Sequence, residues 1–138
     1  MRSIVAALVA VVCTWPSVSV AQPAPAAVSA WVAAPAAGAT SAVAYVEVSN
    51  PTMYEIYITG ATSDAAPTVE LLAGKTGGAE PAVVTEFPVP AYGGTAAADT
   101  APHLRLVGVS RPLAPGDTVL LTLTTDGGAT LKVAAPVR

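Results

Sequence analysis

Short runs in which apolar and polar residues alternate follow one another along the chain after position 27, with turn residues between them. The clearest run, Ser41–Val48, is rich in β-branched and aromatic residues and ends at the turn signal Asn50-Pro51-Thr52. By the same criteria, strands are predicted at Val28–Val32, Tyr54–Thr59, Thr68–Leu72, Val83–Phe87, His103–Val109, Thr118–Thr124 and Ala129–Ala134. An apolar period of about 3.6 residues nowhere persists for three turns, which argues against helices.

Eight or nine short strands separated by turns are typical of an antiparallel β-sandwich or a small barrel. The last two predicted strands are joined around Asp126-Gly127, a signal for a tight hairpin. Val83–Phe87 runs into Pro88 and Pro90, so this strand is expected at a sheet edge. A length of 138 residues suits a single domain.

The N-terminus has the features of a secretory signal peptide. The positively charged start Met1-Arg2 precedes the apolar run Ser3–Val12. Small residues stand just before Gln22, at the positions that signal peptidase reads. We therefore predict a signal peptide at residues 1–21. Lipoprotein processing at Cys13 is the alternative, but Val stands before this cysteine, where lipoprotein signals normally have a small residue. An apolar run of about ten residues is too short to span a bilayer.

Composition and charge then limit the class of protein. A Pro/Ala linker at 22–27 is predicted to lead into one folded domain at 28–138, and no second apolar stretch approaches membrane-spanning length. The product is expected to be soluble, and periplasmic or secreted. The net charge is −3 with no basic cluster, which excludes a nucleic-acid-binding protein, because such a protein needs cations to neutralise phosphates.

Several segments occur in an order that resembles the PCu(A)C family of periplasmic copper chaperones. These are Ala44–Pro51, Val69-Glu70-Leu71 and His103–Val119, the last with Arg111-Pro112-Leu113 and Gly116-Asp117-Thr118. The resemblance implies a cupredoxin-like β-sandwich, and a family role of delivering copper(I) to a respiratory oxidase centre. We therefore predict an all-β protein with a single antiparallel β-sandwich, cupredoxin-like or immunoglobulin-like, with an oxidase-assembly protein as the partner implied by the family.

The resemblance also implies a copper(I) site of two histidines and two methionines, ligand types that suit a soft ion. Carried over by position, the first histidine becomes Leu72 and the first methionine falls near Pro81-Ala82. His103 matches the second histidine, and Arg105 stands in place of its partner methionine. Met53 matches no ligand position, and a two-ligand His103–Met53 site would need a loop to reach across the sandwich. His103 is therefore the candidate metal ligand of a degenerate site.

Two hypotheses about function follow from these residues. The chain is a copper-chaperone-family protein with degenerate or absent copper binding, or a non-enzymatic β-sandwich that binds a protein and no metal. An enzyme is not predicted, because a triad of His103, Asp99 and a serine would lack a nucleophile elbow. Alternation places His103 and Arg105 on the strand face opposite Leu104 and Leu106, so both are expected to be at least partly exposed.

Overall fold

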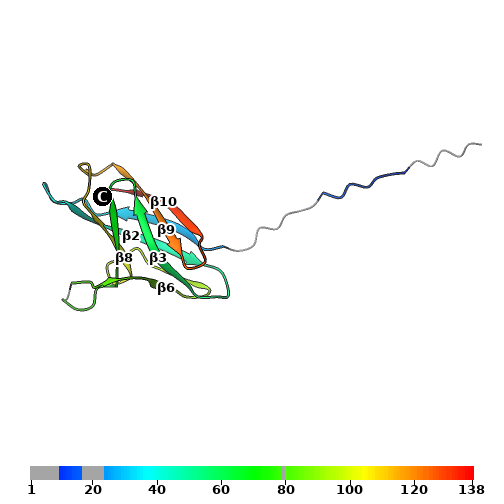
Figure 1. Ribbon diagram of the computed structural model, residues 1–138, viewed down its shortest axis with the longest axis horizontal. Coiled ribbons are helices and arrows are strands. Elements are labelled where there is room, and N and C mark those ends of the chain that lie inside the picture. The colour runs from blue at the N-terminus through cyan, green and yellow to red at the C-terminus, as the bar shows by residue number, and fades with distance from the viewer. Residues whose placement is uncertain (1–9, 17–23, 79) are drawn as a thin grey trace, which may run out of the picture.

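The computed structural model describes residues 10–16, 24–78 and 80–138. The strands between residues 26 and 136 form two antiparallel sheets packed face to face (Figure 1). Most of the predicted signal peptide lies outside the described residues, so its cleavage before Gln22 stays a prediction. Cys13 lies in the described part and is exposed. Within the described ranges there is no helix of the length and apolarity needed to cross a membrane.

The larger sheet, sheet A, has six strands centred on β2 (Ser41–Asn50). β1 pairs with one side of β2, while β8 and then β7 pair with the other side, and β4 and β5 follow beyond β8. The bounds of these strands are Ala26–Val32 (β1), Thr68–Leu72 (β4), Val83–Val84 (β5), Gly93–Thr95 (β7) and His103–Val107 (β8).

The smaller sheet, sheet B, has four strands in the order β10-β9-β3-β6. Their bounds are Ile56–Ser63 (β3), Phe87–Val89 (β6), Thr118–Thr125 (β9) and Thr130–Pro136 (β10). A parallel bridge between Val32 and Val137 joins the first and last strands along one side of the sandwich.

The all-β sandwich predicted from the sequence is confirmed, with corrections to individual strands. Val83–Phe87 is two strands, because β5 pairs with β4 in sheet A whereas β6 pairs with β3 in sheet B. Both lie at sheet edges, as the neighbouring prolines predicted. Residues 93–95, where no strand was predicted, form β7, because the last residues of β2 offer them backbone partners. Ala26 and Ala27, assigned to the linker, pair with β2 for the same reason.

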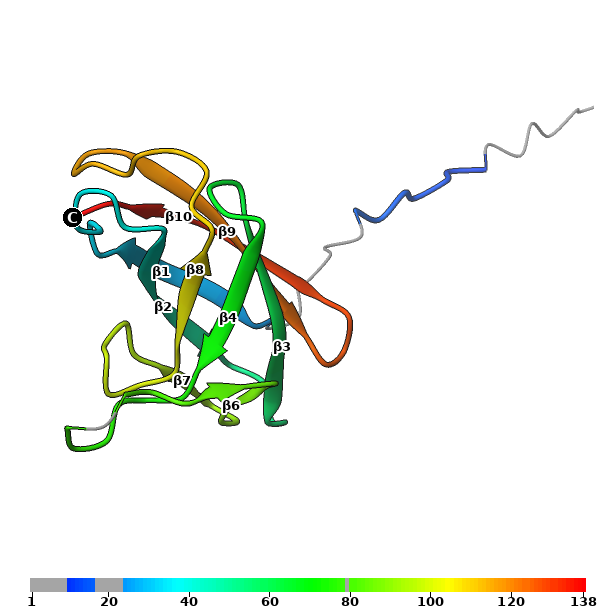
Figure 2. The ribbon, with the colours of Figure 1, turned by 60° about the vertical axis from the view of Figure 1, so that its left-hand side comes forward.

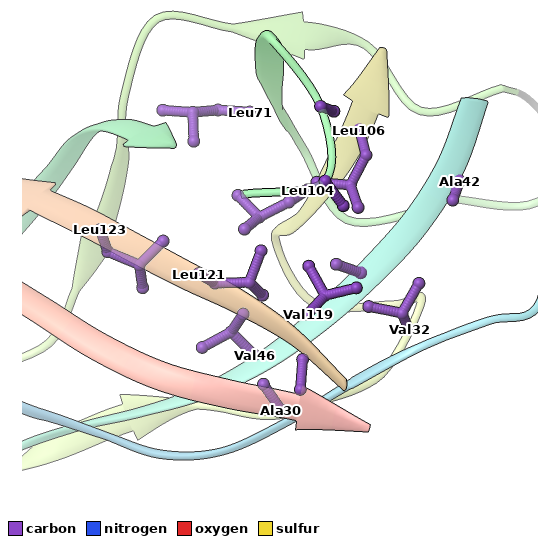
Figure 3. Close-up of a cluster of buried hydrophobic side chains, with 14 of the residues drawn as sticks. Ala30, Val32, Ala42, Val46, Leu71, Leu104, Leu106, Val119, Leu121 and Leu123 are labelled. Atoms are coloured by element: carbon purple, nitrogen blue, oxygen red, sulfur yellow. The ribbon is translucent and has the colours of Figure 1, made fainter. Parts of the chain in front are cut away.

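The core lies between the two sheets and is made of aliphatic side chains together with one aromatic ring, that of Phe87 (Figure 3). β9 buries every second residue, so Val119, Leu121 and Leu123 face sheet A. Leu104 and Leu106 of β8 meet them and are no more than 1% exposed. Since this face of β8 is fixed by the core, the side chains of His103 and Arg105 are left on the outward face of sheet A.

Candidate functional site

The outward face of sheet A holds His103 at the start of β8. The register of β4 and β8 places Leu72 opposite His103, and Glu70 opposite Arg105. The predicted alternation is confirmed, because Leu104 points into the core and its neighbours on β8 point away from it. Two of the positions implied by the family resemblance, Leu72 and Arg105, are therefore neighbours of His103.

His103 is nevertheless buried, with 4% of its surface exposed, so the expectation of partial exposure was wrong for this residue. The strand pairing continues beyond it: the backbone N–H of Lys75 donates to the carbonyl of Asp99 at 2.7 Å. Gly74 lies so close to residue 100 that an added Cβ would overlap that backbone. The paired chain thus extends past His103, so this residue does not lie at an open end of the sheet. Arg105 is partly exposed, as predicted, with 33% of its side chain accessible.

A hydrogen bond fixes the proton on the imidazole of His103. Nδ1 lies 2.8 Å from the carbonyl oxygen of Ala101. A carbonyl can only accept, so Nδ1 carries the proton and donates, and Nε2 of the neutral ring keeps its lone pair. Among the described residues, Thr95 Oγ1 is the one fully buried side-chain nitrogen or oxygen without a hydrogen-bond partner. Nε2 of His103 has no hydrogen-bond partner in the described part of the chain and is not among these fully buried atoms, so it keeps some contact with solvent. It is the ring nitrogen able to bind a metal ion.

A row of rings crosses the outward face beside His103. The centroids of Trp31 and Tyr45 are 4.5 Å apart, and those of Tyr45 and His103 are 5.3 Å apart. The guanidinium of Arg138 lies 5.4 Å from the centre of the Trp31 ring, a cation–π contact. Burial raises the pKa of the Tyr45 hydroxyl, and the negative charge of Asp99 raises it further. This row connects β1, β2 and β8 and fixes the orientation of the imidazole.

Sequence reasoning missed the row as a unit. Its members come from three strands, and the single signal available was that Trp31 and Tyr45 lie on predicted strands. The register that makes Trp31 and Tyr45 direct partners is set by the pairing of β1 with β2.

Arg105 forms an ion pair with Glu70 across the two strands, with Nη1 and Oε2 3.2 Å apart. The two side chains are 33% and 32% exposed, so the pair contributes on the order of 0.2–1 kcal/mol to stability. Glu70 offsets the charge that Arg105 brings close to His103. The position that matches a methionine thus holds a side chain with no lone pair to offer a metal.

The side chains at the matched positions around His103 offer few donor atoms for copper(I). Leu72 is 1% exposed and fills the space beside His103 with an isobutyl group. Met53 lies between β2 and β3 with 63% of its surface exposed, outside this buried space. No three His, Cys, Asp or Glu side chains gather into a metal-binding group anywhere in the described ranges. His103 is the one side chain at the matched positions that could ligate copper(I).

The fold is that of PCuAC domains, which confirms the resemblance noted in the sequence. The solution structure of the Cu(I) form of DR1885 from Deinococcus radiodurans is 33% identical, with a TM-score of 0.69 over 86% of this chain and 81% of that one. The copper-bound PCuAC domain from PmoF2 has a TM-score of 0.68 at 21% identity, over 83% and 90% of the two chains, and shows the shared fold.

Within this class the chain belongs to the LpqE-like family, because the family model "Putative lipoprotein LpqE-like" matches residues 26–137. One relative, "Putative lipoprotein Lxx21020" from Leifsonia xyli, is 34% identical over 112 residues, which are 79% of this chain. The chain spans 66% of the length of that relative.

Proposed function

We propose that this chain is an exported, non-enzymatic protein of the PCuAC class that acts by binding a partner protein and does not hold copper(I) in a four-ligand site of its own. The observation that carries the proposal is the pair of residues beside His103. Leu72 is its cross-strand neighbour, and Arg105, on the same face, is bonded to Glu70. Neither side chain has a donor atom for copper(I). Leu72 is buried, and the guanidinium of Arg105 is held by Glu70.

In a second candidate function, the chain contacts copper(I) as cargo without storing it. Because Nδ1 of His103 donates to the carbonyl of Ala101, Nε2 keeps its lone pair and is available as a single ligand. One imidazole could contact a copper(I) ion whose other ligands belong to a partner. The chain would then assist the delivery of copper to a respiratory oxidase, the role implied by the family, without storing the ion.

Export rests on the sequence features of residues 1–21 and on the name of the relative, a putative lipoprotein. We propose a periplasmic or secreted protein released by cleavage before Gln22. Mass measurement of the exported product tests the cleavage site. A mature mass beginning at Gln22 supports the proposal, and a diacylated N-terminal Cys13 would replace it with lipoprotein processing.

Titration with copper(I) under reducing conditions, against a chromogenic chelator such as bicinchoninate, tests the missing four-ligand site. The expected result is that the mature protein withdraws no copper from the chelator at equimolar concentration. If the second candidate function holds, weak binding appears at higher protein concentration, His103→Ala removes it and Met53→Leu does not. Tight binding of one ion by the unaltered chain would overturn the proposal, and tight binding that survives His103→Ala would also place the site elsewhere.

A further inference from the structure

Exposed apolar side chains gather at one end of the sandwich. β2 and β4 end there while β3 and β8 begin there, as antiparallel pairing requires (Figure 2). Met53, Tyr54 and Tyr92 are 63%, 71% and 74% exposed. The backbone N–H of Tyr92 donates to the carbonyl of Thr52 at 3.0 Å, so the two loops that carry these side chains lie against each other. We call these three residues the apolar rim.

The same end carries the unbalanced charge of the folded domain. The loops at this end hold five acidic side chains, Glu55, Glu80, Glu86, Asp99 and Asp126, and one basic side chain, Lys75. The rest of the domain holds four of each: Glu47, Asp64, Glu70, Asp117, Arg105, Arg111, Lys132 and Arg138. Two of those acids are already paired, in Arg105–Glu70 and Arg111–Asp64. The net negative charge of the domain is therefore located beside the apolar rim.

An open groove of about 610 Å³ runs from the rim onto the outward face of sheet A. Glu47 and Ser49 of β2 line one side, Tyr92 and Ala96 line the other, and Gly93 and Gly94 form the floor. Position 94 must be glycine, because a Cβ there would lie 2.3 Å from a backbone oxygen of β2. The Glu47 carboxylate is oriented by Ser29, whose Oγ donates to Oε2 at 3.0 Å.

Tyr92 is held in an unfavourable backbone conformation at the rim of this groove. Its φ is +53°, a left-handed conformation that bulky side chains rarely adopt. The conformation directs an aromatic ring into solvent, where it gains little from burial. Strain of this kind persists where the surrounding structure imposes it, and it concentrates at binding sites.

We propose that the groove and the apolar rim bind a partner protein through an extended loop that carries arginine or lysine. The cationic side chain lies between the Tyr92 ring and the Glu47 carboxylate, as a cation–π contact and an ion pair. Apolar side chains of the same loop cover Met53 and Tyr54. The negative charge of this end selects a cationic partner surface and repels an anionic one.

This inference rests on the proposed function and adds the chemistry of the partner. Glu47 lies two residues beyond Tyr45 on the same face of β2, so a partner seated in the groove approaches the ring row that ends at His103. The groove would thus bring a partner to the one imidazole on this face.

A matched pair of capped peptides tests the proposal with the mature protein. One alternates arginine with valine and leucine, and the other has glutamate in place of each arginine. Binding is followed by backbone amide chemical shifts. The expected result is that the basic peptide shifts the amides of residues 47–49 and 92–96, that its affinity falls as salt rises, and that the acidic peptide does not bind. No binding at millimolar peptide, equal binding of both peptides, or shifts confined to another face would each overturn the proposal.

Four variants make the test specific: two single substitutions, the double variant that combines them, and a control. Tyr92→Asn removes the ring but suits the left-handed backbone, and Glu47→Gln removes the charge. Each is expected to weaken binding about two- to five-fold, and the double variant about ten-fold. Leu120→Ser, at a 57% exposed position of β9 in sheet B, is the matched control and leaves peptide binding unchanged. Copper titration of Tyr92→Asn separates the peptide-binding proposal from the proposal about copper. Its copper(I) affinity should equal that of the unaltered protein, whether or not the basic peptide binds.

Discussion

Replacing Leu72 with His and Arg105 with Met tests whether these positions converge with His103 on one metal-binding surface. Leu72 and His103 are direct cross-strand partners. In such a pair the two Cβ atoms lie about 4.5–5.5 Å apart. Residue 105 lies on the same strand face, two residues along β8. The double variant therefore presents two imidazoles and one thioether, a donor set that suits copper(I).

The stability cost of this variant follows from burial. Leu72 is 1% exposed, so losing its apolar burial costs about 1.5–3 kcal/mol, and a buried imidazole with an unpaired nitrogen adds about 1–3 kcal/mol. Arg105→Met removes an ion pair whose side chains are about one-third exposed, which costs about 0.2–1 kcal/mol. The melting temperature without metal should fall by about 4–8 °C for each kcal/mol in a small domain. Copper(I) at about 100 times its Kd should raise the free energy of unfolding by about 2.7 kcal/mol.

Two assays check this prediction: chelator competition for copper(I), and thermal unfolding with and without copper under reducing conditions. Lys132→Met is the matched control, because it also replaces a cation by a thioether but at an exposed position of sheet B. The double variant should bind copper(I) more tightly than the unaltered chain and melt higher with the metal present, whereas the control should do neither. A double variant that keeps its β-sheet circular dichroism yet gains no affinity would refute the convergence of these positions.

Three further outcomes are expected. Leu121→Ala should lower the free energy of unfolding in urea by about 2–5 kcal/mol, because the side chain is 1% exposed in the core and leaves a cavity. Asp99→Asn should lower the pKa of Tyr45, seen as phenolate absorbance against pH, because it removes a charge that raises this pKa while burial remains. Since the folded-state pKa lies above the unfolded value, the stability contributed by Tyr45 is present below pH of about 10 and is lost as pH rises through the folded pKa. Gly94→Ala should lower the free energy of unfolding in urea, because the added Cβ would lie 2.3 Å from a carbonyl oxygen of β2. Gly60→Ala is the control and should not lower it, because nothing lies within 4 Å of the added Cβ.

The positions of most strands could be read from the residues, because alternation and turn chemistry are local properties. Thr68–Leu72 has the same bounds in the structure as in the prediction, and the long run from Ser41 became β2. The outward placement of His103 and Arg105 followed from the alternation with Leu104 and Leu106. Local pattern was insufficient between Val83 and Val89, where two short segments pair with different sheets.

The candidate site was determined in part by sequence and in part by pairing. Residue types alone limit the metal donors, since the chain after residue 21 holds one histidine, one methionine and no cysteine. That Leu72 faces His103, and that Glu70 bonds to Arg105, depends on the register of β4 against β8, strands separated by 30 residues of chain. Register is set by the whole sheet and its core, so it could not be read from either strand.

Burial is the property that the tertiary structure alone decided. Alternation predicts which way His103 points, but its burial depends on the neighbours that strand pairing brings to it, Leu72 of β4 and Tyr45 of β2. The carbonyl of Ala101 fixes its proton. Likewise, Met53 and Tyr92 are far apart in sequence. They share one rim because the last residues of β2 pair with β7. The sequence determines the chemistry available and the face on which it lies, and long-range strand pairing decides which of these groups meet and which stay open to a partner.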